Sequence, residues 1–262
     1  MEIPIIVSHL GNQSYFHKVL EQAKRFNKNV YAIGDSIPPC QYDIKDYSER
    51  ANKLSAIYEH LSTNGYVIEL MCFNRWNIML EFMEKHNIPV AFHIDTDVLI
   101  FTNVTEEWER FSQFDFTLSH RCCGSNSFFT IEGLKGICDF FTEFYSDKNS
   151  YTYHRLAAHY HIRRKFNLNG GVCDMTLLEH YSYLNCGKVG EMMHIFNSST
   201  YDHSINESDQ YYRMKGGIKD ITFKNKLPYC HQEKMGKDIQ FKTLHFQGPA
   251  KNLIQRIVDE NR

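Results

Sequence analysis

Apolar residues follow two patterns along the first 120 positions: short β-branched runs and longer stretches with helical spacing. The short runs predict buried strands at 3–10, 29–33, 66–71, 90–97 and 114–119. The helical spacing predicts helices over 14–26, 48–61 and 75–86, the second capped by Ser48. Strands that alternate with helices imply βαβ crossovers. We therefore expect an α/β fold with a mostly parallel central sheet flanked by helices.

The pattern is less regular beyond position 120. A helix is predicted over 131–145, followed by a stretch rich in Tyr and His, the turn-rich segment FNLNGGV at 166–172 and a polar loop at 197–209. A final helix is expected after Pro249. Because no repeat or linker divides the chain, we expect a single domain over 1–262.

Composition and charge narrow the function classes. The chain has 262 residues, 42% hydrophobic, and a formal net charge of −2, which gives no global electrostatic basis for binding nucleic acid. Its eight cysteines form no CxxC pair, which favours reduced thiols. No apolar segment reaches the roughly 20 residues of a membrane span. The start of the chain enters a strand pattern at once, so we expect a cytoplasmic protein.

Two aspartates interrupt the apolar run AFHIDTDVLIF at 91–101. On a strand, Asp95 and Asp97 would point to one face and Thr96 to the other. Ligands of open α/β sheets bind beyond the carboxyl ends of the strands, where this pair is expected. Two close carboxylates repel each other unless a cation lies between them, and oxygen ligands favour Mn²⁺ or Mg²⁺. A cation site is the favoured interpretation, with a solvated turn as the alternative.

A second motif, LHFQGPAK at 244–251, has the spacing H-x-x-G-x-x-K. The imidazole of His245 can complete a site begun by two carboxylates. Gly248 permits close backbone approach, and Lys251 presents a point charge to phosphate. Taken alone, the spacing fits equally a strand histidine followed by a turn and a lysine at a helix start.

Together the two motifs resemble the GT-A glycosyltransferases, most of all the group that contains glycogenin and the bacterial lipooligosaccharide galactosyltransferases. The resemblance implies a Rossmann-like sheet and a bound Mn²⁺ or Mg²⁺ held by Asp95, Asp97 and His245. It also implies that Lys251, with Asp95, contacts the nucleotide diphosphate. Residues 1–120 would then form the nucleotide-binding half, and 121–262 the half that completes the metal site and binds the acceptor.

Other stretches occur in the order of the family's motifs. Arg75-Trp76 resembles the R-[YW]-x-x-L helix, whose arginine reaches the nucleotide-sugar, and the first strand would place Ser8 near base and ribose. FNLNGGV resembles the segment near the donor sugar, which implicates Asn169, Gly170 and Gly171. Asp209-Gln210 resembles the DQ pair beneath the sugar.

The chain departs from the family pattern at three places. Asn252-Leu253 stands where Pro-Trp is usual, Tyr211 stands where an acid follows the DQ pair, and 87–89 reads Asn-Ile-Pro in place of Gly-Gly. These departures bear on the family assignment and on the stereochemistry more than on the fold.

The chemistry of sugar transfer defines further candidate residues. Loss of a nucleotide diphosphate gives the anomeric carbon oxocarbenium character, so a group must stabilise the opposite sugar face or deprotonate the acceptor. Asp174, Asp209 and Gln210 are the candidates; a carboxylate base favours inversion and an amide favours retention. Asp174 could instead cap a helix over 175–181. Asp35 ends the second strand, where it could meet the base or ribose or form a simple Gly-Asp turn.

Two other polar clusters each allow a functional and a structural interpretation. His154, His159 and His161 could suggest zinc, but a helical stripe of apolar residues runs through the same stretch and favours histidines that flank a packed face. The basic cluster at 163–165 favours a solvated helix end, with a phosphate-bearing acceptor or anionic lipid as the functional alternative.

The sequence therefore predicts a metal-dependent glycosyltransferase that moves a sugar from a nucleotide-diphosphate donor, in the first place a UDP-sugar, to a glycan or lipid-linked acceptor. Contact with the inner face of a membrane is compatible with this function. Two alternatives are a phosphatase of the haloacid-dehalogenase type, with Asp95 as nucleophile, and a module that binds a nucleotide-sugar without transferring it.

Overall fold

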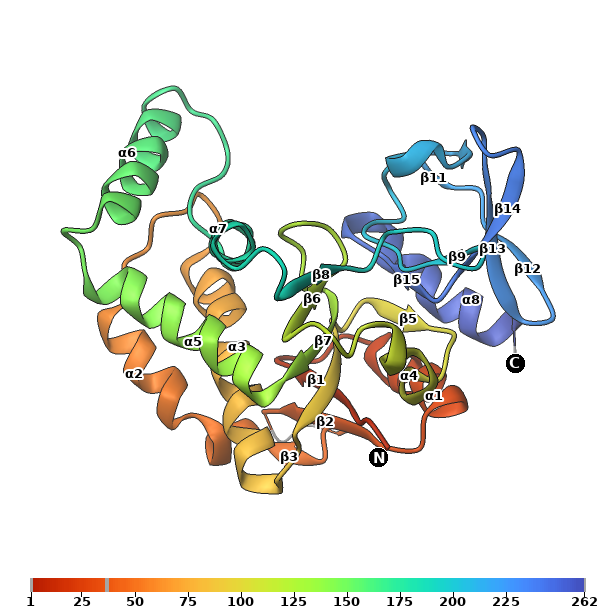
Figure 1. Cartoon of the computed structure of the whole chain (residues 1–262), viewed down its shortest axis with the longest axis horizontal. Helices are drawn as coiled ribbons and strands as arrows, with labels where there is room; N and C mark the ends of the chain where they lie inside the picture. The colour runs from red at the N-terminus through yellow and green to blue at the C-terminus, as the bar shows by residue number, and fades with distance from the viewer. Residues whose placement is uncertain (1, 36–37, 262) are drawn as a thin grey trace.

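The computed structural model describes residues 2–35 and 38–261, and a mixed seven-stranded sheet runs through its centre (Figure 1). The strand order is β3-β2-β1-β4-β7-β6-β8. Pairing is parallel from β3 to β4 and between β6 and β8, and antiparallel on both sides of β7. The strands are β1 Ile5–His9, β2 Val30–Gly34, β3 Tyr42–Asp43, β4 Val90–Ile94, β6 Phe116–Leu118, β7 Asn126–Thr130 and β8 Val189–Glu191. The expected α/β architecture with a mostly parallel sheet is confirmed.

Helices cover both faces of this sheet. Side chains of β1 alternate, so that Ile5 and Val7 enter one apolar core and Ile6 enters the other. The first core includes α1 Phe16–Phe26 and α8 Ile254–Glu260; the second includes α2 Glu49–Ile57, α3 Tyr66–His86, α5 Ile131–Ser146, α6 Tyr151–Lys165 and α7 Asp174–Leu184. A short helix, α4 Val104–Glu107, follows β5 Val98–Ile100. None of the helices in the described part of the chain has the length and apolar composition of a bilayer span.

Smaller sheets built mostly from the last third of the chain stand beside the central one (Figure 1). The largest has the order β12-β13-β14-β9, and β10 pairs with β11 in a hairpin. These strands are β9 Ser199–Thr200, β10 Met214–Lys215, β11 Ile218–Lys219, β12 Thr222–Lys224, β13 Leu227–Gln232 and β14 Lys237–Phe241. In the last pair, β15 Thr243–His245 runs antiparallel to β5 Val98–Ile100. The final strand of the chain is therefore joined to the strand that follows the two aspartates.

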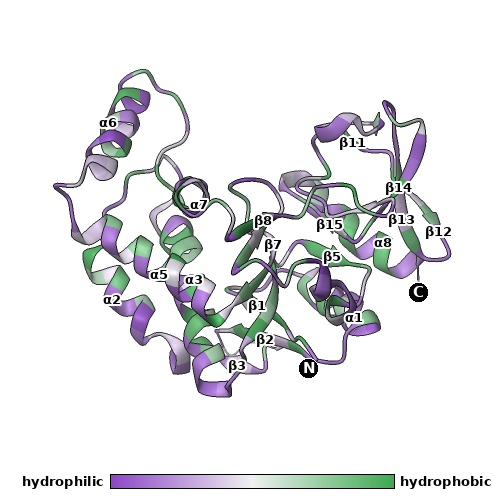
Figure 2. Ribbon diagram, viewed as in Figure 1, coloured by the Kyte–Doolittle hydropathy of each residue, from purple (hydrophilic) through white to green (hydrophobic). Residues whose placement is uncertain are grey.

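The strand predicted at 66–71 is wrong, because these residues form the first turns of α3. The run Tyr66-Val67-Ile68 is apolar but lies on the surface, with exposed fractions of 50%, 72% and 67%. A buried strand cannot expose three consecutive side chains. Instead, the opposite face of the helix is buried, beginning at Glu69 and Phe73. Figure 2 colours the ribbon by hydropathy and shows apolar and polar segments interspersed along the described chain.

Other predicted boundaries need smaller corrections. The helix predicted over 48–61 ends at Ile57, and the Ser48 hydroxyl donates to the Ile44 carbonyl at 2.5 Å instead of capping that helix. The helix expected after Pro249 begins as the 3-10 turn Gly248–Leu253, which α8 continues.

Candidate active site at the end of β4

The two aspartates lie in a tight turn between β4 and β5. The Val98 amide donates to the Asp95 carbonyl at 3.1 Å, and the Asp95 amide donates to the Ser125 carbonyl at 2.7 Å. β4 ends at Ile94, so the predicted strand over 90–97 is too long and the argument from strand alternation is wrong. The turn itself brings the carboxylates together.

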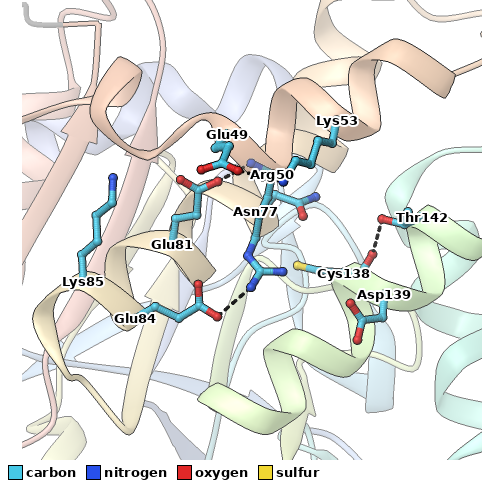
Figure 3. Close-up of a pocket in the computed structure, with 10 residues that line it drawn as sticks. All are labelled: Glu49, Arg50, Lys53, Asn77, Glu81, Glu84, Lys85, Cys138, Asp139 and Thr142. Carbon is cyan, nitrogen blue, oxygen red and sulfur yellow. Dashed lines mark hydrogen bonds and ion pairs between the residues drawn. The ribbon is translucent and has the colours of Figure 1, made fainter.

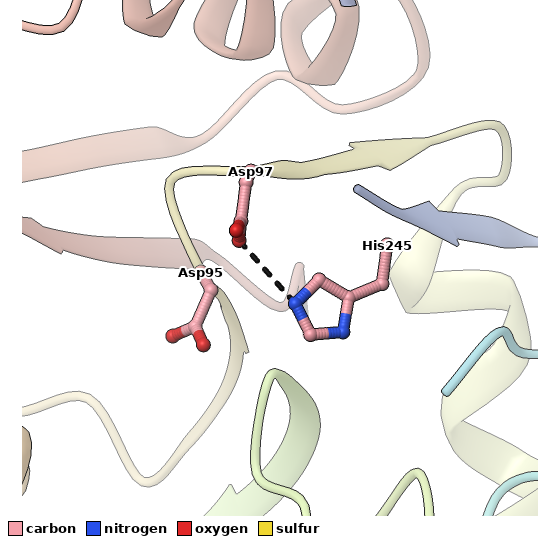
Figure 4. Close-up of side chains that lie close together, drawn as sticks. All are labelled: Asp95, Asp97 and His245. Carbon is pink, nitrogen blue, oxygen red and sulfur yellow. Dashed lines mark ion pairs between the residues drawn. The ribbon is translucent and has the colours of Figure 1, made fainter. Parts of the chain in front are cut away.

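His245 joins the aspartates because β15 pairs with β5, which places His245 opposite Val98. Its Nε2 lies 3.4 Å from Asp97 Oδ1, and Lys251 Nζ lies 3.1 Å from Asp97 Oδ2. One potential ligand atom from each of Asp95, Asp97 and His245 falls within 4.8 Å of the others. Figure 4 shows the Asp97 carboxylate directed at the imidazole, with Asp95 alongside. The predicted donor set therefore converges at one point.

Asp95 is also held by side chains from α3 and β4. It accepts hydrogen bonds from the Arg75 guanidinium and from His93 Nε2, the latter at 2.9 Å. The other end of the guanidinium reaches Asp174 Oδ2 at 2.8 Å. Burial raises the pKa of Asp95, but Arg75 and His93 outweigh it and hold this pKa well below its usual range. Asp95 is thus an ionised carboxylate in a fixed orientation.

Asp174 is the first residue of α7 and accepts three hydrogen bonds. Oδ1 accepts from the Met175 amide at 2.8 Å, and Oδ2 accepts from Arg75 and from Trp76 Nε1, the latter at 3.2 Å. The helix cap is Cys173, so Asp174 is not the cap itself. Arg75 joins two of the predicted site carboxylates, one from each half of the chain.

The ring of His245 has a defined orientation. Nδ1 lies 2.6 Å from the His203 carbonyl oxygen, and because a carbonyl can only accept, Nδ1 carries a proton. Nε2 is therefore the atom that faces Asp97. Burial lowers the pKa of His245, but Asp97 and Cys123 outweigh it and raise this pKa well above the usual value. A cation that used Nε2 would have to displace the proton held there.

Cys123 and His203 lie beside the candidate cation site and were not identified from the sequence. Burial raises the pKa of the Cys123 thiol, but His203 and His245 outweigh it and lower this pKa to about 5. Cys123 Sγ also lies 3.2 Å from Ser125 Oγ. The sequence carried no spacing signal for these residues, because they come from separate loops.

A cavity of about 350 Å³ opens over the turn. Charged side chains line one part of it, namely Arg75, Asp95, Asp97 and Lys251. Its other walls come from the end of β1 and the start of α3 and include Ser8, Leu10, Val67, Ile68 and Met71. The Ser8 hydroxyl is buried and has no partner among the described residues. The cavity therefore combines a charged floor with a largely apolar wall.

Solved structures with a similar fold identify the architecture. Mouse xyloside xylosyltransferase 1, in its apo form, gives a TM-score of 0.52 at 15% identity over 84% of this chain and 96% of its own. The bifunctional glycosyltransferase WbbM gives 0.50 at 10% identity over 99% of this chain and 49% of its own. The chain has the GT-A fold. No protein-family model and no curated protein sequence matches it, so the likeness is one of fold.

Asp35 holds the loop that follows β1 at the edge of the GT-A cavity. Its Oδ2 accepts a hydrogen bond at 3.0 Å from the amide of Gly11, in the loop after β1. Gly11 has a φ of +88°. Asp35 is not part of the cavity lining, whereas Ser8 is. Of the two predicted nucleotide contacts from the first two strands, Ser8 lines the cavity, whereas Asp35 stabilises the loop after β1.

Residues 169–171 fasten the loop between α6 and α7 to the segment before α3. The Gly170 amide donates to Thr63 Oγ1 at 2.8 Å, and the Thr63 amide donates back to the Gly170 carbonyl at 3.1 Å. A Cβ on Gly171 would lie 2.2 Å from the Leu61 carbonyl oxygen, which explains the glycine. Asn169 uses its carbonyl to accept from Arg163. None of the three lines the cavity.

The Asp209-Gln210 pair lies in a 3-10 turn outside the cavity lining of the GT-A fold. Asp209 Oδ1 is 2.7 Å from Lys219 Nζ, and Gln210 Nε2 donates to the Met193 carbonyl at 2.9 Å. Burial raises the pKa of Asp209, although Lys219 opposes the shift. The pair connects to the cation site through Lys219 and not by direct contact.

The predicted packed face of α6 is confirmed. The stripe residues Tyr153, Leu156, Ala157 and Tyr160 are buried, whereas His154, His159 and His161 are exposed. Over residues 2–35 and 38–261, the only cluster of three metal-ligating side chains is the one at Asp95, so these histidines form no such group.

A second cavity, of about 400 Å³, lies between α2, α3 and α5 (Figure 3). Four of its charged side chains form two ion pairs: Arg50 with Glu84 at 2.8 Å and Lys53 with Glu49 at 2.7 Å. Because these charges are compensated internally, this groove is typical of a solvated surface and gives no sign of a ligand.

Proposed function

We propose that this chain is a metal-dependent glycosyltransferase. It moves a sugar from a nucleotide-diphosphate donor, specifically a UDP-sugar, to a hydroxyl of a glycan or lipid-linked acceptor. One observation carries the proposal: in a GT-A fold, Asp95, Asp97, His245 and Lys251 converge on a cavity bounded by the end of β1.

The donor set fits Mn²⁺ or Mg²⁺. Two carboxylates supply hard oxygen ligands, and one imidazole nitrogen makes Mn²⁺ the better match. When bound, such a cation supplies positive charge that stabilises the departing diphosphate. Lys251 supplies a second positive charge beside Asp97, which suits the same phosphates.

Other residues of the cavity have defined tasks in this proposal. Ser8 offers an unpartnered hydroxyl for the nucleoside and lines the same cavity as the charged residues. Arg75 keeps Asp95 ionised and oriented while it binds Asp174. Among the three predicted catalytic side chains, Asp174 is linked to Asp95 through their shared partner Arg75, whereas Asp209 and Gln210 lie outside the cavity lining.

The phosphatase alternative has less support. Its nucleophilic aspartate would follow the first strand of its fold, whereas Asp95 follows β4. Asp95 also forms an ion pair with Arg75 and a hydrogen bond with His93, and both contacts weaken a carboxylate as a nucleophile. Inorganic phosphate released from a phosphomonoester would revive this alternative.

Thermal shift combined with product release tests the proposal. We expect Mn²⁺ and UDP together to raise the melting temperature by more than the sum of their separate effects, because each completes the other's site. We also expect UDP release from a UDP-sugar in a panel that is offered with acceptors. No joint shift would refute the donor site. A joint shift without UDP release from any donor would instead identify a module that binds without transfer.

A further inference from the structure

Lys219, at the end of β11, is a fully buried lysine whose ammonium has close oxygen neighbours in three residues. Nζ lies 2.8 Å from Asp202 Oδ1 and 2.7 Å from Asp209 Oδ1, and it also donates to the Ser204 carbonyl. The side chains of Lys219 and Asp202 are both 0% exposed. A lysine so placed is held by its partners and not by water.

Asp202 carries this contact to His245. Its two carboxylate oxygens serve different donors: Oδ1 accepts from Lys219, and Oδ2 accepts from the His245 amide at 3.0 Å. The buried carboxylate therefore links the ammonium on one side to the His245 amide on the other.

The segment 202–205 holds His245 at two further points. The His203 carbonyl accepts from His245 Nδ1 at 2.6 Å, and the Ile205 amide donates to the His245 carbonyl at 2.9 Å. Lys219 also binds this segment through its backbone, since its amide donates to the Ile205 carbonyl at 2.7 Å. The segment is clamped between Lys219 and the histidine whose Nε2 faces Asp97.

We propose that Lys219 is a positioning residue for the candidate cation site. Through Asp202 and the segment 202–205, Lys219 fixes the position and ring orientation of His245. Through Asp209 it connects the Asp209-Gln210 turn to the same histidine. This inference rests on the proposed function, because it assigns a role at the same site. It explains why a lysine is buried about 25 residues before the histidine, at a position with no local motif.

The experiment measures Mn²⁺ affinity directly, by electron paramagnetic resonance of the free ion, alongside the melting temperature. Lys219→Met removes the ammonium and keeps much of the volume. We expect Mn²⁺ to bind about tenfold to a hundredfold more weakly, the usual effect of losing a residue that orients a metal ligand. The Mn²⁺ concentration that gives half-maximal UDP release should rise in parallel, while the rate at saturating Mn²⁺ changes by less than about threefold.

A matched control and a second variant make the result specific. Lys215→Met alters an exposed lysine of the same hairpin and should leave affinity unchanged. Asp202→Asn replaces one of two acceptors by a donor, which must then face either Lys219 or the His245 amide. It should weaken Mn²⁺ binding about tenfold, and it serves as the test if Lys219→Met does not fold.

The double variant Lys219→Met with Asp202→Asn tests whether the two residues affect Mn²⁺ affinity through the same contact or independently. If both residues act through His245, the double variant loses no more affinity than the weaker-binding single variant. Losses that multiply, or folded single variants with wild-type affinity, would overturn the inference while leaving the proposed function intact. Wild-type protein that takes up no Mn²⁺ would overturn both.

Discussion

Asp95 and Asp97 are positioned by a backbone turn between adjacent strands, whereas His245 is positioned by buried charges from distant segments. The aspartate region is held mainly by the β4–β5 connection and by nearby side chains such as Arg75 and His93, with one backbone hydrogen bond to Ser125. The histidine region needs β15 paired with β5, the segment 202–205 and Lys219. The candidate cation site is thus built from a local half and an assembled half.

The largest expected effect concerns the salt bridges that hold the local half. Arg75→Met leaves Asp95 and Asp174 without their shared cation, and a broken buried ion pair costs about 3 kcal/mol or more. Urea unfolding should therefore show a loss of about 3 kcal/mol. Arg50→Met breaks a more exposed pair with Glu84 and should cost less than about 1 kcal/mol. Equal losses in the two variants would show that Arg75 does not hold the aspartate region.

A second expected effect concerns Asp97, which the two halves share. Asp97→Asn removes the charge that faces both His245 and Lys251, so Mn²⁺-linked UDP binding should weaken by about a hundredfold or more. Isothermal titration of UDP with and without Mn²⁺ measures this linkage. Glu132→Gln, an exposed acid on α5, is the control. Retained linkage in Asp97→Asn would remove Asp97 from the site.

The smallest expected effect is a pH dependence that belongs to the assembled half. The pKa of His245 is raised in the metal-free protein, so its stabilising proton is fully held below about pH 6.5 and is lost as pH rises through the folded-state pKa. Mn²⁺ competes with that proton. Below the raised pKa, affinity should therefore grow up to about tenfold per pH unit.

Mn²⁺ titrations across that range check the slope. In His245→Gln the proton is absent, so binding should be weaker and nearly independent of pH between about pH 6 and pH 8. A wild-type affinity that does not change with pH would mean that the cation does not use His245 Nε2.

Sequence patterns predicted the candidate ligand residues of both halves but not the contacts that position them. DxD and HxxGxxK identified Asp95, Asp97, His245 and Lys251, because their chemistry is written in residue type and spacing. The role of Lys219 was not predicted, because its partners come from other segments and share no sequence spacing with it.

The fold class and most elements of the first 120 residues were predicted, whereas the strands β7 to β14 were not. Within the first 120 residues, one error arose where exposure contradicted hydropathy. Tyr66-Val67-Ile68 has the composition of a strand, but the run starts a helix and remains on the surface, where it forms part of the cavity wall. Apolar composition does not reveal which side chains the tertiary structure leaves in water. The Asp95–Asp97 turn was missed for a related reason, because the apolar flanks of the pair made one continuous strand look plausible.

The pairing of β15 with β5 also has a consequence for the order in which the molecule matures. His245 lies about 150 residues after Asp97, so a growing chain carries half of the cation site long before it can close the other half. Only a chain that has been synthesised past His245 can bring all three candidate ligand side chains together. Because ligand binding favours the state that binds it, a bound ion would selectively stabilise chains that include His245 over chains that stop before it.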